Sequence, residues 1–258
     1  MKRWNGWGDD DNALDYALSA SALGFLASLI GKSAPLPDAS LEQVLARVPA
    51  SRLPPHALYS LDAQDRVRHA RGQSLPDWLA LRSGEFGMFP DGVAFPDSSA
   101  AVRDLLQHAA DHQIDVIPYG GGTSVVGHIN PVDRGRPVLT VDMTRMNKLM
   151  HLDRESQIAT FGAGTVGPRV EAQLAAEGYT LGHYPQSWEL STIGGWVASR
   201  PAASNRCAMA GSNSCLPAAA LKPCRGRWRF PPSPPRRRGP TCANFSLEPR
   251  VAWVLSPR

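Results

Sequence analysis

The chain has 258 residues, of which 43% are apolar and 19% charged, enough for one large domain or two small ones with a sizeable core. A chain that is disordered throughout is therefore excluded. The net charge of +4 hides a division, because residues 201–258 carry ten Lys or Arg against the single acid Glu248, whereas residues 1–200 carry 17 basic and 22 acidic side chains. All four cysteines also lie beyond residue 200, and a thiol-free first part fits a reducing, cytoplasmic location.

The first predicted element is a helix over the apolar run Tyr16–Ile30. Aspartates at 9–11 precede the run, and Gly31 follows it. We expect an amphipathic helix that an aspartate caps and Gly31 ends. The run is too short to span a bilayer and lacks a basic region before it, so we expect neither a transmembrane segment nor a signal peptide.

Residues 1–88 are predicted to form short helical and irregular elements that wrap a larger domain. LEQVLARV has a helical pattern, and Pro54, Pro55 and Pro76 break up the segment that follows. Trp4 and Trp7 could touch a substrate, but an indole buries a large apolar area in any fold, so anchoring of the N-terminal segment is the preferred interpretation.

Residues 89–200 have an α/β pattern. A short strand, PDGVAFP, leads to Ser98 and Ser99, which offer a cap to a helix. The apolar residues of this helix are spaced helically at Val102, Leu105, Leu106 and Ala109. Further strands are predicted at IDVIPYG, PVLTVDM and QIATFGAGTV, followed by a helix over Pro168–Glu177. This order predicts an α+β or α/β ligand-binding domain.

Three consecutive glycines, Gly120–Gly122, follow the strand IDVIPY. Without side chains they let a ligand approach the backbone, and they permit positive φ, so that successive amides can point the same way. Such a nest binds phosphate or pyrophosphate, and the Thr123 and Ser124 hydroxyls are further donors. The spacing fits neither a nucleotide-hydrolysing P-loop nor G-x-G-x-x-G.

A second polar loop, PQSWELSTIGGWVAS, contains Gly194 and Gly195 about seventy residues later. Two such loops suit a long, bent ligand held between subdomains, as a dinucleotide would be.

These motifs carry a resemblance to a known family. PDGVAFPDSSAAVRDLLQHAADHQ, VIPYGGGTSVVG and PQSWELSTIGGWVAS resemble the FAD-binding (PCMH-type) domain of the vanillyl-alcohol-oxidase type flavoproteins. RWNGWG, RHARGQSLPD and STIGGWVASR resemble the alkyldihydroxyacetonephosphate synthase type within that superfamily. The resemblance covers nearly all of residues 1–200. It implies an α+β, two-subdomain FAD-binding fold, incomplete here, with residues 1–88 as wrapping segment and 89–200 as partial FAD-binding domain.

The resemblance also implies cofactor-binding residues. Those expected at the FAD pyrophosphate and beside it are Pro118, Tyr119, Gly120, Gly121, Gly122, Thr123, Ser124 and Gly127. Those expected along the ribityl and ring region are Pro185, Ser187, Thr192, Gly194, Gly195 and Ser199. Some members of the superfamily attach the flavin to a histidine directly after the glycine pair; Gly122 and Thr123 occupy that place here, so we expect noncovalent FAD.

Several ionisable side chains have two interpretations each. His69 and His183 could be acid/base groups, but structural or surface histidines are preferred. Arg68, Arg71 and Arg82 could bind a substrate phosphate, but solvated or ion-paired roles are preferred. No catalytic residue is assigned, and no metal site is expected, since the cysteines form no C-x-x-C pair.

The Pro/Arg-rich stretch 201–258 is interpreted as a frameshift product, disordered in the protein. Read one frame over, the region from Arg200 can encode SSGQQPLRYGRIEQLFAGGG and, at its end, LVGTEGRLGILTE, which continues the family resemblance. At two junctions between codons the shifted reading does not depend on which synonymous codon is used. Met209 with Ala210, and Trp253 with Val254, must each give Gly, and both glycines fall where the restored sequence needs them. Loss of one base in the Arg200 codon would produce this arrangement.

The resemblance implies an FAD enzyme in which a fatty alcohol replaces the acyl group of an acylated dihydroxyacetone phosphate. The chain itself is expected to be inactive, because the family's substrate domain lies C-terminal of the flavin loops. An FAD-linked oxidase or dehydrogenase of a 2-hydroxy acid or other alcohol is the alternative enzyme. A truncated flavin-domain protein with a basic arm for nucleic acid or an acidic partner is the non-enzyme alternative. The expected partners are a small-molecule or lipid-like substrate and a second copy of the full-length protein, not nucleic acid.

Overall fold

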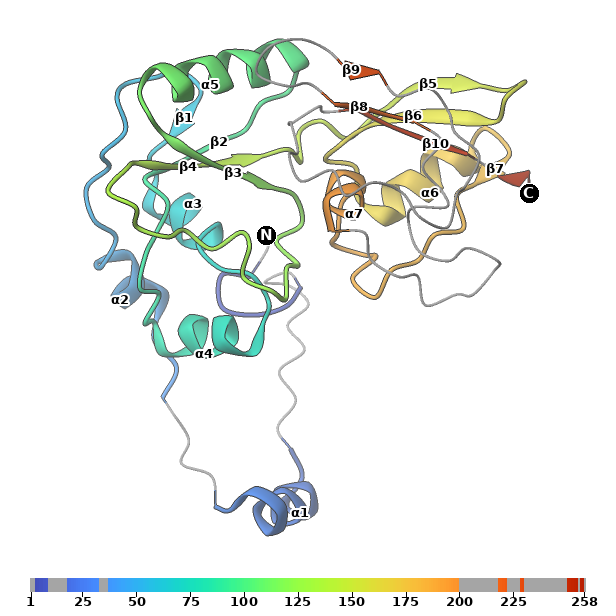
Figure 1. Cartoon of the computed structure of the whole chain (residues 1–258). Coiled ribbons are helices and arrows are strands. Elements are labelled where there is room, and N and C mark those ends of the chain that lie inside the picture. Colours follow the sequence, from blue (N-terminus) through green and yellow to red (C-terminus); the bar gives the residue numbers. More distant parts are fainter. Residues whose placement is uncertain are drawn as a thin grey trace.

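The computed structural model describes residues 3–8, 18–32 and 37–199, with the strand backbones at 218–221, 228–229, 250–254 and 256–257. The chain forms two lobes, each with its own sheet and helices (Figure 1). This arrangement confirms the predicted α+β class. The remainder of 201–258, where the sequence predicts disorder, lies outside the described residues.

The first lobe is built on a four-stranded sheet in the order β1-β2-β4-β3. Its strands are β1 (Tyr59–Ser60), β2 (Gly92–Ala94), β3 (Asp115–Tyr119) and β4 (Val138–Asp142). β1 pairs antiparallel with β2, whereas β2, β4 and β3 run parallel. The carboxyl ends of parallel strands meet at one edge of a sheet, so the last residues of β3 and β4 lie side by side.

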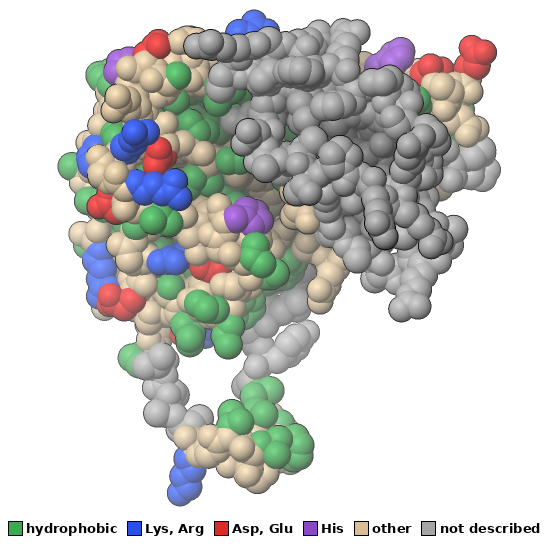
Figure 2. Space-filling model, in the orientation of Figure 1, with side chains coloured by type: hydrophobic (Ala, Val, Ile, Leu, Met, Phe, Trp, Pro, Cys, Tyr) green, Lys and Arg blue, Asp and Glu red, His purple; other side chains and the backbone are tan. Residues whose placement is uncertain are grey.

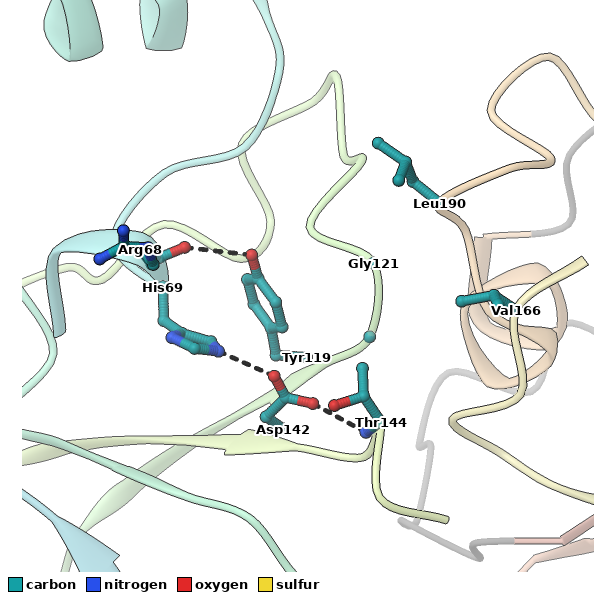
Figure 3. A pocket seen from close by; sticks show the side chains of 9 residues that line it. Arg68, His69, Tyr119, Gly121, Asp142, Thr144, Val166 and Leu190 are labelled. Atoms are coloured by element: carbon teal, nitrogen blue, oxygen red, sulfur yellow. Dashed lines mark hydrogen bonds and ion pairs between the residues drawn. The ribbon is translucent and has the colours of Figure 1, made fainter. Parts of the chain in front are cut away.

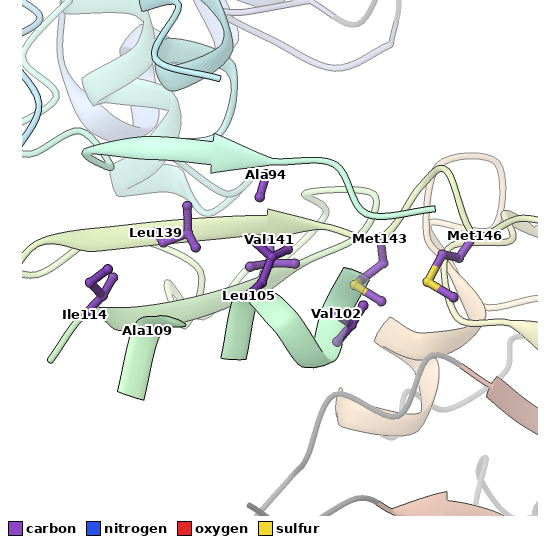
Figure 4. Packing of buried hydrophobic residues seen from close by; sticks show 9 residues of the cluster. All are labelled: Ala94, Val102, Leu105, Ala109, Ile114, Leu139, Val141, Met143 and Met146. Carbon is purple, nitrogen blue, oxygen red and sulfur yellow. The ribbon is translucent and has the colours of Figure 1, made fainter. Parts of the chain in front are cut away.

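Helix α5 (Ser99–Asp111) packs on one face of this sheet. Its residues Val102, Leu105 and Ala109 are buried against Leu139 and Val141 of β4 (Figure 4). The Ser98 hydroxyl accepts a hydrogen bond from the Ala101 N–H at 3.2 Å. The predicted helix, its cap and its buried face are confirmed.

Three short helices lie on the other side of the sheet: α2 (Leu41–Leu45), α3 (Ala63–Arg68) and α4 (Leu75–Ser83). Ser40, Asp62 and Ser74 cap their N-termini. The three helices share a hydrophobic core that includes Phe86. The Trp4 ring stacks on Phe86 at a centroid distance of 6.5 Å. That contact supports the anchoring interpretation of Trp4.

The second lobe holds an antiparallel sheet in the order β5-β6-β10-β8-β9. Its strands are β5 (Leu149–Asp153), β6 (Ile158–Gly162), β8 (Ala218–Leu221), β9 (Trp228–Arg229) and β10 (Arg250–Val254). Helices α6 (Gly167–Ala175) and α7 (Ile193–Ser199) pack against β6 around Phe161, Leu174 and Trp196. β7 (Tyr179–Thr180) pairs with β11 (Ser256–Pro257). The division at residues 88 and 200 stays a prediction.

Helix α1 (Ala20–Ile30) differs from the expected one. Its cap is Ser19, whose hydroxyl accepts from the Ala22 N–H at 3.2 Å, not an aspartate. The predicted end at Gly31 is confirmed, with φ of 87°. An amphipathic helix would bury one face, but no residue of α1 is buried, and hydrophobic side chains lie exposed on it (Figure 2). None of the described helices combines the length and the hydropathy that a bilayer-spanning helix needs.

Candidate functional site: a cleft between two glycine loops

The glycine-rich loop begins where β3 ends, at the sheet edge that faces the second lobe. Tyr119, the last residue of β3, is buried, and its hydroxyl donates to the Arg68 carbonyl at 3.2 Å. Gly122 has φ of 68°, the left-handed conformation that glycine adopts without strain. The positive φ expected in this loop is confirmed at Gly122.

The second loop lies directly against the first. A Cβ built on Gly120 would lie 3.2 Å from the Thr192 Cβ, and one on Gly121 would lie 2.6 Å from the Leu190 carbonyl carbon. A real Cβ does not come as close as 2.6 Å to another heavy atom, so Gly121 has no room for a side chain. At these two positions glycine therefore allows the loops to approach each other, whereas the sequence indicated only room for a ligand.

Backbone hydrogen bonds hold the second loop to the second lobe. The Ile193 N–H donates to the Thr165 carbonyl at 2.9 Å, and the Gly194 N–H donates to the Ala163 carbonyl at 2.8 Å. The Trp196 indole N–H donates to the Ser191 hydroxyl at 2.7 Å. This loop is consequently part of the lobe's rigid core.

The expected cofactor-binding residues differ in exposure and fall into three groups. Tyr119, Gly122, Pro185 and Thr192 are buried, and Gly120, Gly121, Thr123, Ser124, Gly127, Ser187 and Gly194 are partly buried. Pro118, Gly195 and Ser199 are exposed. The Ser124 hydroxyl bonds to the His128 ring at 3.2 Å, and the Ser199 hydroxyl donates to the Gly195 carbonyl at 2.7 Å. The structure brings the two loops together; the role of each residue toward FAD stays a proposal.

A cavity of about 250 Å³ opens between the loops (Figure 3). Gly120 and Gly121 line it from the first lobe, and Val166 and Leu190 line it from the second. Its volume lies below the range of roughly 300–1,000 Å³ typical of small-molecule sites, so it would take part of a dinucleotide.

A buried, hydrogen-bonded histidine and aspartate line the cavity. His69 Nε2 lies 2.8 Å from Asp142 Oδ2, and both side chains are buried. His69 Nδ1 bonds to the Asp65 carbonyl at 2.7 Å, and Asp142 Oδ1 accepts from the Thr144 N–H at 2.7 Å. Sequence reasoning missed Asp142 and Thr144. The parallel register places Asp142 opposite Tyr119, so the position at the end of a parallel strand was the signal that could have found it.

His183 and the arginines have structural partners. His183 is buried, its ring lies 5.1 Å from that of Trp196, and burial lowers its pKa below 6.5. Arg71 donates to the Phe86 carbonyl, and Arg82 pairs with Asp38 at 2.5 Å. Arg71 also lies 3.7 Å from Asp77 Oδ1. These contacts support the structural interpretation of His183 and the ion-paired one of Arg71 and Arg82. Arg68 lines the cavity and donates to Gln64 at 3.1 Å.

The backbone of the glycine-rich loop is suited to bind the phosphates of a dinucleotide. Residues 118–130 contain no Lys or Arg, so an anion there would depend on backbone N–H groups and hydroxyls, for which the left-handed Gly122 is suited. Among the described residues, no group of three or more His, Cys, Asp or Glu could hold a metal ion.

A two-lobed α+β fold with paired glycine loops in the cleft defines a dinucleotide-binding flavoprotein class. The sequence model of the FAD binding domain family matches residues 90–221. The chain belongs to this family.

Comparison with individual proteins shows which members of the family the chain resembles. The chain is 33% identical over 231 residues to alkyldihydroxyacetonephosphate synthase of Dictyostelium discoideum, covering 76% of this chain and 38% of that protein. A solved structure of alkyldihydroxyacetonephosphate synthase superposes with a TM-score of 0.82 at 26% identity, covering 99% of this chain and 54% of that one. An uncharacterized FAD-linked oxidoreductase of Escherichia coli (strain K12) is 33% identical over 111 residues, 43% of this chain and 22% of that protein. The chain thus spans about two fifths to half of the synthases it matches.

Proposed function

We propose that this chain is the N-terminal, FAD-binding part of an enzyme of the alkyldihydroxyacetonephosphate synthase type. The observation that carries the proposal is the extent of the likeness, which runs over 76% of this chain at 33% identity and extends to the structure at a TM-score of 0.82. The wider protein would exchange the acyl group of an acylated dihydroxyacetone phosphate for a fatty alcohol. Its substrate would be lipid-like, its assembly a homodimer and its location cytoplasmic.

In this proposal the two glycine loops hold FAD between the lobes. Backbone N–H groups of residues 120–124 bind the pyrophosphate, beside Pro118, Tyr119 and Gly127, and Thr123 adds a hydroxyl donor. Pro185, Ser187 and Thr192 lie along the ribityl chain and ring, together with Gly194, Gly195 and Ser199. FAD, when bound, supplies the electron-accepting isoalloxazine ring.

FAD is held noncovalently in this proposal. The position after the glycine pair, where some related flavoproteins have a histidine, is taken by Gly122 and Thr123. Neither residue has a nucleophilic ring nitrogen, so FAD is held by noncovalent contacts with the loops. We assign no catalytic residue and propose that the 258-residue chain has no exchange activity.

A second candidate is an FAD-linked oxidoreductase acting on an alcohol such as a 2-hydroxy acid. The likeness to the Escherichia coli oxidoreductase favours it at the same identity, but over 43% of the chain rather than 76%. The synthase type is preferred for that reason.

The test is a titration of FAD with the purified chain, followed by an activity assay. Quenching of FAD fluorescence reports binding, and acid precipitation should leave the flavin in the supernatant, since no covalent bond holds it. Yellow protein in the pellet would contradict noncovalent binding, and an absence of quenching at high micromolar FAD would contradict the flavin assignment for this chain. Conversion of acyl-dihydroxyacetone phosphate and labelled hexadecanol into labelled alkyl-dihydroxyacetone phosphate and free fatty acid by the full-length gene product, with no oxidation of 2-hydroxy acids, separates the two enzymes.

A further inference from the structure

The segment RHARGQSLPD, residues 68–77, lies behind the glycine-rich loop and is hydrogen-bonded to it at two places. The Gln73 N–H donates to the Ser124 carbonyl at 2.6 Å, which fixes the near end of the loop. At the far end, the Gly72 N–H donates to Asn130 Oδ1 at 3.1 Å, and Asn130 Nδ2 donates to Asp77 Oδ1 at 2.6 Å. The Asn130 side chain therefore joins the loop to both the turn before α4 and α4 itself.

Asp77 is a rigid anchor for this contact. Its side chain is 1% exposed, and Oδ2 accepts from the Ser74 N–H at 3.1 Å and from the Ser74 hydroxyl at 2.5 Å. Arg71 lies 3.7 Å from Oδ1 and balances its charge. A buried carboxylate that is so fully partnered has one low-energy position, so it fixes Asn130 as well.

Packing does little to hold the same loop. Between residues 123 and 130 Ile129 is buried, whereas Val125 is 66% and Val126 is 76% exposed. Gly72 also has no room for a side chain, because a Cβ there would collide with the Ser124 carbonyl oxygen and lie 3.2 Å from Asp77 Oδ2. The conformation of residues 123–130 thus depends on hydrogen bonds from residues 72–77, whereas Gly120 and Gly121 also pack against the second loop.

We propose that Asp77, Asn130 and Gly72 are positioning residues of the flavin site, which hold the glycine-rich loop in its anion-binding conformation. The proposal rests on the proposed assignment of residues 120–124 to the FAD pyrophosphate. Because residues 118–130 contain no Lys or Arg, the attraction of this loop for pyrophosphate depends on oriented backbone dipoles. Such dipoles bind tightly only if they are oriented before the ligand arrives, and the contacts with 72–77 provide that orientation.

The decisive variants exchange the two partners. In N130D two carboxylates meet and no donor is left between them, so the contact is broken. In D77N the single amide oxygen must take the place of both carboxylate oxygens, so either the contact with Asn130 or the contacts with Ser74 are lost. In the double variant D77N/N130D, the new amide at position 77 can donate to the new carboxylate at position 130, which still accepts from the Gly72 N–H, while the amide oxygen at 77 accepts from Ser74. The pairing is then restored with donor and acceptor exchanged. S60A is the control, because it removes a hydrogen bond of 2.6 Å to Asp65 in the same lobe away from the loop.

Two readouts are needed, both on the whole 258-residue chain. Hydrogen exchange of the ligand-free protein should show the amides of residues 120–127 exchanging about tenfold faster in N130D, and FAD fluorescence should show affinity about tenfold weaker. D77N/N130D should recover both, and S60A should leave both within about twofold. Urea unfolding gives the free energy of unfolding of each variant, so that FAD affinities can be compared at equal stability.

Each other outcome has a definite meaning. If wild type binds FAD and N130D binds it equally well, the positioning role is overturned while the flavin assignment stands. If S60A weakens FAD as much as N130D at equal stability loss, the effect is global and the positioning role is overturned too. If wild type binds no FAD, the flavin assignment fails, and the positioning role toward FAD fails with it; unchanged hydrogen exchange in N130D would in addition exclude any control of the loop by Asn130.

Discussion

Thr192 and Gly120 come from opposite lobes and touch across the cleft, where a Cβ on Gly120 would lie 3.2 Å from that of Thr192. Thr192 is buried and belongs to the loop that is bonded to the core of the second lobe, while Gly120 directly follows β3 of the first. The relative position of the two lobes is therefore fixed beside the cavity, which Gly120 lines.

Alanine at Gly121 is expected to separate the loops. Its Cβ would meet the Leu190 carbonyl carbon at 2.6 Å, which is backbone and cannot rotate away. We expect G121A to lose about 1–3 kcal/mol of unfolding free energy and to weaken FAD binding at least about tenfold. Urea unfolding and FAD titration measure the two effects.

The control for G121A is G24A on the exposed helix α1, where nothing lies within 4 Å of the new Cβ. This change should be neutral or slightly stabilising, since alanine is the better helix former. Equal FAD affinity in G121A and wild type would show that the loops do not need this close approach.

Local patterns predicted the elements well because local interactions form them. The apolar spacing of α5 and the cap at Ser98 hold in the structure. The cleft was predictable in part, since glycines after a strand indicate a binding loop. Asp142 could be found only by also predicting that its strand pairs in parallel with the strand of Tyr119, because that pairing places the two residues side by side. The predicted aspartate cap of α1 was wrong, because Ser19 within the apolar run caps the helix, which therefore begins later than the aspartates indicate.

Acid should destabilise the second lobe through His183. Burial lowers the folded-state pKa of His183, while the unfolded value is 6.5, so between these values the unfolded state binds a proton that the folded state does not. The stabilising contribution is full above pH 6.5 and is lost as the pH falls below it. Urea unfolding at about pH 7.5, 6.5 and 5.5 should show this slope reduced in H183Q.

His108 adds a slope of the same sign, because burial, followed by the charges of His112 and His56, lowers its pKa too. The comparison is therefore between wild type and H183Q, with H151Q, at an exposed position of β5, as the matched histidine-to-glutamine control. Identical pH dependence in wild type and H183Q would rule out this role for His183.

The apolar surface of α1 should govern association rather than folding. Phe25 and Leu29 are each 65% exposed, and α1 buries no residue. We expect F25S/L29S to leave the urea midpoint unchanged and to reduce light scattering of concentrated protein. L105A, in the core of the first lobe, should instead lose about 2–5 kcal/mol. A loss of that size in F25S/L29S would mean that α1 packs against the folded chain.

The proposed frameshift makes a prediction about the gene. Sequencing of the DNA across the codons for Gly195 to Asn205 should reveal one additional base near Arg200. In the corrected frame, the codons that now encode Trp253 and Val254 would encode a Gly between them. These residues lie in β10, whose backbone pairs with β6. An unchanged DNA sequence would contradict an error in the record. The short chain would then be the gene's product, and its FAD affinity would have to be measured before any reaction is assigned to it.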